Sequence, residues 1–287
     1  MDKPILGIGI FKSRPLVVAT KHRKEEVIAV PVNEALGVHC FGSNLIDTDL
    51  FGTFSGETKR VDDPLTAARK KCELAMNVHG CDLAIASEGS FGPHPNFWFV
   101  AANEELLVFI DRKHRIEVAH REISFDTNFN AKAVESKDDL ESFAKSCGFP
   151  THAIILRESK EGTAQIRKGI TTWSGLYSEY AFIKNNCGSV YAETDMRAMH
   201  NPTRMNVIKK VVQGLINKIK SCCPQCELPG FALKEMKKGL PCRMCGSPTR
   251  SILSHHYVCC GCNHQSEKLF PDNKQSEDPT YCDVCNP

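Results

Sequence analysis

Four pairs of cysteines, each pair separated by two residues, lie between residues 223 and 285 and constrain the fold more than any other feature. Two thiolates at this spacing can sit on one tight turn and point at one ion, and two such turns complete a tetrahedral site that suits zinc. The candidate ligands are Cys223, Cys226, Cys242, Cys245, Cys259, Cys262, Cys282 and Cys285. They predict two structural zinc ions. Iron is the alternative that ligand type alone leaves open.

The chain between the pairs suggests which of them share an ion. The segment 242–262 resembles a zinc ribbon, in which two cysteine turns are separated by a short strand-forming stretch. We therefore expect the second and third pairs to share one zinc, and the first and fourth pairs to share the other in a nested arrangement. Sequential pairing, first with second and third with fourth, is the alternative.

Composition and charge exclude several classes of protein. Hydrophobic residues make up 41% and charged residues 24% of the 287 residues, as in ordinary folded proteins. The net charge of +2 provides no global basic field for nucleic acid or anionic lipid. No apolar run approaches the ~18 residues that span a bilayer, and the first residues do not form a secretory signal. We therefore expect a cytoplasmic protein with no membrane partner, in which clustered cysteines bind metal rather than form disulfides.

Apolar strand-like runs alternate with helical patterns over residues 1–220, which predicts an α/β body with a mixed sheet and flanking helices. Residues 221–287 then form a zinc-ribbon module with two four-cysteine sites. Helices are expected to begin at Pro64, after Ser136, near Trp173 and after Asn201, and strands are expected over 81–86, 96–100 and 106–110.

The densest polar cluster of the body is ASEGSFGPHP, residues 86–95. It follows a buried strand, so Glu88 is expected at a carboxyl end of the sheet, where open α/β folds place their sites. Glu88 and His94 are the candidate catalytic residues. A connecting loop without a function is the alternative, because glycine and proline are common in any loop.

Two other clusters carry charge. The basic turn over residues 21–26 follows the first strand and could hold phosphates, although such runs are often only solvated turns. In the segment 193–204, Asp195 could bind a divalent cation or pair with Arg197, and the ion pair is the simpler interpretation. The sequence contains no phosphate-binding Walker loop and no dinucleotide fingerprint.

Two resemblances to known families add to these patterns. ASEGSFGPHP, TDMRAMHNPTR (194–204) and the cysteine pairs ending in YCDVCNP resemble an uncharacterised, mainly bacterial family of unknown function, which implies no activity. Residues 16 to about 120 resemble the inosine-triphosphate pyrophosphatase-like family, through LVVATKHRKEE, GTFSGETKR, DDPLTAARKKCELAM and DLAIASEG.

The second resemblance implies roles for particular residues. In that family a strand ends in a lysine-containing turn that binds phosphate, and a later strand delivers an acidic residue for magnesium. By position, Lys21 and Lys24 would bind phosphates and Glu88 would hold Mg²⁺, assisted by Asp62 or Glu57.

Two functions are therefore considered. The first is Mg²⁺-dependent hydrolysis of a phosphoanhydride in a nucleotide or phosphorylated small molecule, with Arg69 as a further substrate-binding residue. The second is a non-catalytic adaptor that binds nucleic acid or protein through the zinc ribbons. Its candidate contacts are Lys234, Lys237, Lys238, Arg243 and Arg250.

Overall fold

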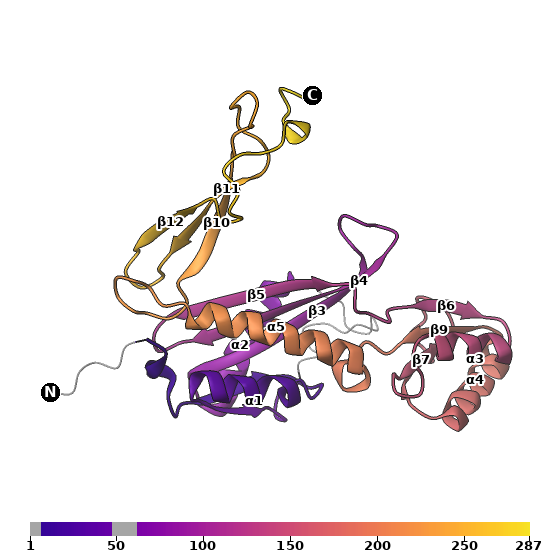
Figure 1. Cartoon of the computed structure of the whole chain (residues 1–287). Helices are drawn as coiled ribbons and strands as arrows, with labels where there is room; N and C mark the ends of the chain where they lie inside the picture. The colour runs from indigo at the N-terminus through magenta and orange to yellow at the C-terminus, as the bar shows by residue number, and fades with distance from the viewer. Residues whose placement is uncertain (1–6, 48–61) are drawn as a thin grey trace.

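The computed structural model describes residues 7–47 and 62–287. The whole segment GTFSGETKR, which contains Glu57, lies outside the described residues. Figure 1 shows three parts in the described chain: a large sheet with helices, a smaller sheet with helices beside it, and a three-stranded cysteine module.

The large sheet has five strands in the order β2-β1-β3-β4-β5. The first three strands in that order run parallel to one another, whereas β3, β4 and β5 form an antiparallel meander. The strands are β1 (Pro15–Ala19), β2 (His39–Gly42), β3 (Leu83–Pro93), β4 (Ala101–Asp111) and β5 (Ile116–Ser124). The predicted mixed sheet is thus present.

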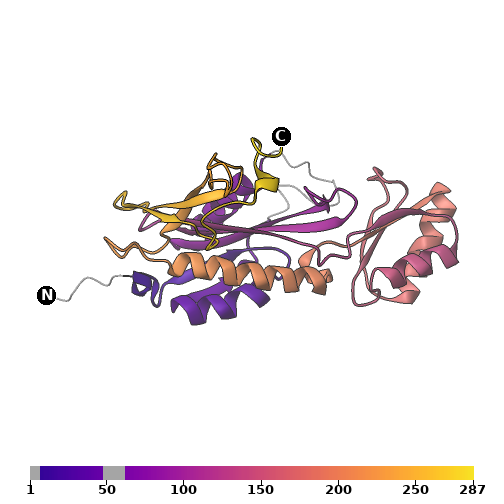
Figure 2. The ribbon, with the colours of Figure 1, turned by 45° about the horizontal axis from the view of Figure 1, so that its top comes forward.

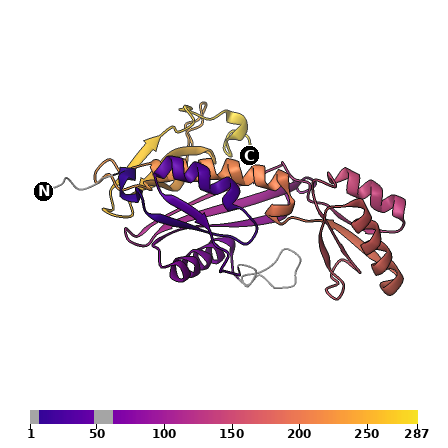
Figure 3. The ribbon, with the colours of Figure 1, turned by 90° about the horizontal axis from the view of Figure 1, so that it is seen from below.

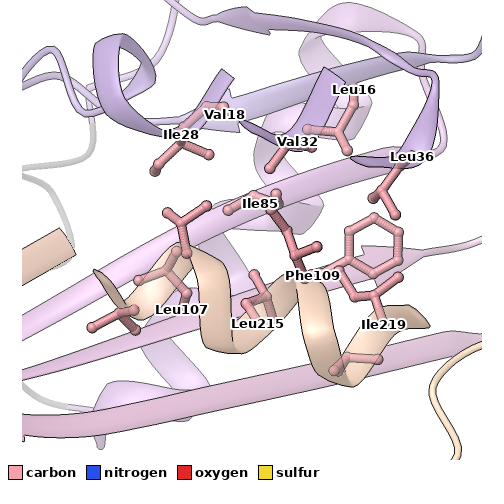
Figure 4. Packing of buried hydrophobic residues seen from close by; sticks show 14 of the residues in the cluster. Leu16, Val18, Ile28, Val32, Leu36, Ile85, Leu107, Phe109, Leu215 and Ile219 are labelled. Atoms are coloured by element: carbon pink, nitrogen blue, oxygen red, sulfur yellow. The ribbon is translucent and has the colours of Figure 1, made fainter. Parts of the chain in front are cut away.

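Helices cover both faces of this sheet. In Figure 3, α1 (Glu25–Leu36) and α5 (Pro202–Lys220) lie together on one face and α2 (Pro64–His79) lies on the other. Because side chains alternate along a strand, Leu83 and Ile85 pack toward α1 and α5, while Ala84 packs toward α2. Figure 4 shows the α1–α5 side of this core. The alternation decides which face each polar residue of β3 and β4 reaches.

Local sequence signals set the helix ends. The Asp63 carboxylate accepts hydrogen bonds from the backbone N–H groups of Leu65 and Thr66 at the start of α2, and Gly80 ends the helix at φ 62°. Asn201 caps α5 in the same way by accepting from the Arg204 N–H. These predicted starts are confirmed.

The second sheet is inserted between β5 and α5 and is antiparallel throughout, in the order β6-β9-β7-β8. Its elements are β6 (Ala131–Val134), α3 (Lys137–Ser146), β7 (Ile154–Arg157), β8 (Arg167–Ile170), α4 (Trp173–Cys187) and β9 (Val190–Thr194). It has its own hydrophobic cluster with α3 and α4, and Figure 2 shows it beside the large sheet. The predicted body over residues 1–220 therefore contains two sheets with separate cores.

The cysteine module follows α5, whose C-cap is Ser221. It is an antiparallel sheet of β10 (Ala232–Lys238), β11 (Ile252–Val258) and β12 (Gln265–Leu269). Short 3-10 helices lie at Gly7–Phe11, Ala198–His200 and Pro279–Tyr281. Within the described ranges, none of the helices is both long and apolar enough to cross a bilayer.

Two local predictions on β3 and β4 are wrong. The segment 86–95 is not a loop, because β3 runs to Pro93 and pairs with β4 along its whole length. Glu88 consequently lies in the middle of an 11-residue strand, two residues beyond the last pairing with β1. The expected strand over 96–100 is instead the tip of the β3–β4 hairpin. In each case the long pairing partner, which local sequence does not show, determines the structure.

Candidate functional site

Eight cysteines gather into two clusters whose geometry fits metal ions. One cluster contains Cys223, Cys226, Cys259 and Cys262, and the other contains Cys242, Cys245, Cys282 and Cys285. Neighbouring sulfur atoms across each cluster lie 3.6–3.9 Å apart. A tetrahedron of thiolates at ~2.3 Å from zinc has edges of ~3.8 Å, whereas a disulfide bond is only ~2.05 Å long. Each cluster can therefore hold one zinc ion.

The pairing of the cysteine turns differs from both predicted arrangements. The first pair joins the third and the second joins the fourth, so the two clusters are interleaved. Strand β11 runs between Cys245 and Cys259 and is seven residues long, which separates these turns by about 23 Å at ~3.3 Å per residue. The antiparallel β10 brings the first pair back to the end of β11 where Cys259 lies. The expected sharing of one ion between 242/245 and 259/262 is wrong for this reason.

Backbone and hydroxyl groups near the clusters favour thiolates. The N–H groups of Gly261 and Cys262 point at the Cys259 sulfur at 3.4 and 3.5 Å. The hydroxyl and backbone N–H of Ser247 hold the pKa of the Cys245 thiol at about 6. Since a metal binds the thiolate, hydrogen bonds of this kind favour metal loading near neutral pH.

In the body, one face of β3 carries a buried lysine at the start of α1. The Lys24 ammonium is 7% exposed and donates to the Ser87 hydroxyl at 2.8 Å. Burial and the positive charge of Arg204 together lower the pKa of Lys24 to about 7. A buried ammonium whose hydrogen bonds go to a hydroxyl and a carbonyl is poorly compensated, which makes Lys24 a candidate for binding an anion.

The same face carries a buried ion pair across Gly89. Arg204 on α5 donates to Glu105 on β4 at 2.7 Å, and both side chains are fully buried. A Cβ at Gly89 would lie 2.3 Å from the Arg204 Nη2 and 2.7 Å from the Glu105 Oε1. This ion pair therefore fills the space beside Gly89.

Glu88 faces the opposite side of the sheet. Its carboxylate is only 10% exposed and forms an ion pair with Lys71 on α2. Glu105, the nearby buried carboxylate of β4, lies on the other face with Arg204, so these two carboxylates cannot hold one ion together. Asp62, the expected helper, pairs with Lys70 at 2.6 Å. The described residues therefore do not fit the Mg²⁺ site that the resemblance implies.

The remaining candidate residues of the body lie apart from Lys24. Lys21 is half exposed and pairs with Asp47 at 2.9 Å. Arg69 makes a two-pronged contact with Glu117 on β5, at the register of Ala84 rather than of Glu88. Arg69 thus ties α2 to the edge of the sheet, and the predicted substrate contact is not assembled.

His94 is also distant from Glu88. Six residues of extended strand separate the two, which is about 20 Å at ~3.3 Å per residue. The His94 ring accepts hydrogen bonds from the N–H groups of Asn96 and Phe97 and stacks on Phe125 at 4.7 Å. It orders the hairpin tip, so the two predicted catalytic residues do not form one site.

Directly after β9 of the second sheet, Asp195 forms the expected ion pair. Its buried carboxylate accepts from the Arg197 guanidinium at 2.6 Å and from the Gly169 N–H at 3.0 Å. The carboxylate is therefore occupied by donors, and the ion-pair interpretation is confirmed.

With this geometry described, sequence comparison gives the family of the chain. Residues 71–287 match a family described as a domain of unknown function, DUF6671. The chain belongs to this family. No curated protein matches the chain. The expected membership of an uncharacterised family is confirmed, and its description names no activity.

Three of the buried charges of this DUF6671 member lie on or next to β3 and β4 and were not among the predicted site residues: Lys71, Glu105 and Arg204. Lys71 lies four residues after Ala67 and four before Ala75, which are both buried. Arg204 lies four residues before Ile208 on the apolar stripe of α5. For Lys71 and Arg204, helical spacing relative to buried residues was the available signal.

Proposed function

We propose that this chain binds a phosphorylated small molecule of the nucleotide class where β1 ends beside β3, and that its cysteine module is built around two zinc ions. The observation that carries the first part is Lys24, a buried ammonium held by Ser87 at the start of a helix. The N-terminus of a helix favours anions through its free N–H groups and its dipole.

The charges around this point support an anionic ligand. On the face of the sheet that carries Lys24, Arg204 and Glu105 are also less than a tenth exposed. These three groups carry one more positive than negative charge when all are ionised. Because a buried charge is costly without compensation, an incoming phosphate would be stabilised here. A buried lysine with a lowered pKa is typical of functional sites.

Hydrolysis of a phosphoanhydride in the ligand is the reaction that the pyrophosphatase-like resemblance implies. We assign no step of it to Mg²⁺, because Glu88 is already paired with Lys71 and the second buried carboxylate faces away. The proposal therefore rests on phosphate binding, and hydrolysis is assayed separately.

The alternative adaptor function gains no support from the charges of the module. Lys237 pairs with Glu267, Arg243 with Asp278 and Arg250 with Asp283. These three cations were candidate contacts to nucleic acid, but acidic residues of the same module already neutralise them. A nucleic-acid surface needs unpaired positive charge along one face.

The test measures binding of nucleoside triphosphates and of inorganic pyrophosphate by calorimetry, with and without Mg²⁺. We expect Lys24→Met to weaken binding at least tenfold while the fold is retained, since the change removes a buried charge. Lys210→Met is the matched control, because Lys210 pairs with Asp126 on the surface. Equal binding by wild type and Lys24→Met would contradict the proposal.

Phosphate release from the same nucleotides measures hydrolysis. Glu88→Gln removes the carboxylate charge at nearly constant shape. If wild type hydrolyses a nucleotide and Glu88→Gln does not, the carboxylate takes part in the reaction. If Glu88→Gln retains full activity, Glu88 serves only to pair with Lys71.

A further inference from the structure

An exposed group of large apolar side chains lies at the tip of the β3–β4 hairpin and on the segment that follows β5. We call it the aromatic patch, and its members are Phe97, Trp98, Phe99 and Phe125, whose rings contact one another. Trp98 is 80% and Phe99 72% exposed. Single exposed apolar residues are ordinary, but a contiguous group of this kind marks an interaction surface. In Figure 1 the hairpin projects beyond the end of the sheet.

The rings of the aromatic patch hold one another in place. The rings of Trp98 and Phe99 meet edge to face, with their centres 5.9 Å apart. The centre of the Phe97 ring lies 6.5 Å from that of Phe99 and 6.3 Å from that of Phe125. The backbone of the tip is also fixed, since the Val100 N–H donates to the Phe97 carbonyl and the His94 N–H donates to the Val100 carbonyl. An ordered surface loses little conformational entropy when a partner covers it.

Charge narrows the kind of partner. The segment 90–103 contains no Asp, Glu, Lys or Arg. Nucleic acid and anionic lipid both require cations at the contact, so an uncharged tip does not suit them. The partner that complements this surface is itself apolar and uncharged.

The area of the patch fits a second copy of the same chain. The exposed fractions of its four members add up to about two and a half whole aromatic side chains, which is roughly 500 Å² at ~200 Å² each. Two copies facing each other would bury on the order of 1,000 Å², the size that a specific protein interface should reach. An apolar surface is complementary to itself, and a two-fold contact closes without leaving a patch free.

We propose that the aromatic patch mediates a two-fold symmetric homodimer, in which the β3–β4 hairpin tips of two copies pack against each other. Trp98 and Phe99 lie at the centre of the contact because they have the most surface to bury. This proposal is independent of ligand binding at Lys24.

The test is sedimentation velocity of the full-length, zinc-loaded protein from about 1 to 100 μM. We expect wild type to sediment as a dimer at the upper end of this range and Trp98→Ser/Phe99→Ser to remain monomeric throughout, with at least a tenfold weaker dimer. Both side chains are exposed, so circular dichroism and zinc content should stay the same. Val30→Ser/Phe182→Ser, which removes two other exposed apolar side chains, is the matched control and should remain dimeric.

Fluorescence gives a second readout. The chain has two tryptophans, and Trp173→Phe leaves Trp98 as the sole emitter. We expect its emission to shift to the red on dilution, as Trp98 moves from the dimer contact into water. A wild-type chain that is monomeric at 100 μM overturns the proposal. So does a monomer that floats with neutral phosphatidylcholine vesicles, because lipid would then cover the patch, and so does a dimer that survives Trp98→Ser/Phe99→Ser.

Discussion

The cysteine module and the buried charges of the large sheet are organised in opposite ways. We use "buried charges" for Lys24, Lys71, Glu88, Glu105 and Arg204. The eight ligands of the module lie in pairs two residues apart, so their chemistry is visible in the sequence even though their partners are not. The groups near Lys24 come from α1, α2, β3, β4 and α5, and Arg204 and Glu105 are separated by 99 residues. Metal ligands can thus be recognised from residue type and spacing, whereas a charged site in an α/β fold depends on which strands become neighbours.

The largest expected effect comes from removing ligands in selected pairs. In Cys226→Ser/Cys259→Ser both changes fall in one cluster, so elemental analysis should still find one zinc per chain. Nested or sequential pairing instead predicts that this variant loses both ions. Structural zinc contributes an apparent ~10–16 kcal/mol to folding, so the damaged end of the module should become sensitive to protease. Cys222→Ser/Cys260→Ser, which changes two neighbouring cysteines outside both clusters, should retain two zinc ions.

Among the buried charges, the largest effect on stability is expected at Arg204. Arg204→Met leaves the Glu105 carboxylate buried and uncompensated, which should lower the free energy of unfolding by about 3–5 kcal/mol. Urea denaturation followed by circular dichroism measures it. Lys210→Met breaks an exposed pair and should change the same quantity by less than ~1 kcal/mol. A similar loss in both variants would show that the buried pair has no special weight.

A smaller effect is expected at Gly89. Gly89→Ala puts a Cβ 2.3 Å from Arg204, and the crowding should lower the free energy of unfolding by about 1–3 kcal/mol. Gly92→Ala is a matched control on the same strand, since no heavy atom lies within 4 Å of its Cβ position. The difference between the two midpoints in urea isolates the contact with the ion pair.

A gradual effect, small over any one pH unit, is a pH dependence of stability due to Lys24. Its pKa falls from 10.5 in the unfolded chain to about 7 in the folded one, so between these values the unfolded state binds the extra proton. The contribution of Lys24 to stability therefore rises from pH 7 to about 10.5 and is constant below pH 7, with a slope of at most ~1.4 kcal/mol per pH unit. We expect the difference in urea midpoint between wild type and Lys24→Met to increase over this pH range. A flat difference would mean that Lys24 is solvated.

Local signals predicted the elements better than their partners. Asp63 with Pro64, Ser136 and Asn201 mark helix starts through hydrogen bonds within one turn, and the helices begin there. The span of β3 was underestimated because its length depends on pairing with β4. That strand contains the apolar run Leu106–Ile110, many residues later in the chain. The separate second sheet was missed for the same reason, since its strand order is not sequential.

The arrangement of the buried charges could be predicted only in part. Lys24 lies in the basic turn after β1, and that position together with the pyrophosphatase-like resemblance made it a candidate phosphate contact. Glu88 was expected at the end of a strand but lies in the middle of β3, and the strand register determines that it meets Lys71 rather than an ion. No local pattern in the sequence could show that Gly89 accommodates a guanidinium from α5.

The interleaved clusters also limit how related sequences can vary in length. Each strand of the β10–β12 meander connects an end that carries one cysteine cluster to an end that carries the other. Inserting one residue in β11 would displace a cysteine turn relative to its partner unless β10 and β12 lengthened with it. By contrast, the segment from 270 to 276 follows β12 and can change length with little effect on either ion. Insertions and deletions in homologues should therefore fall in such connecting segments and spare the strands.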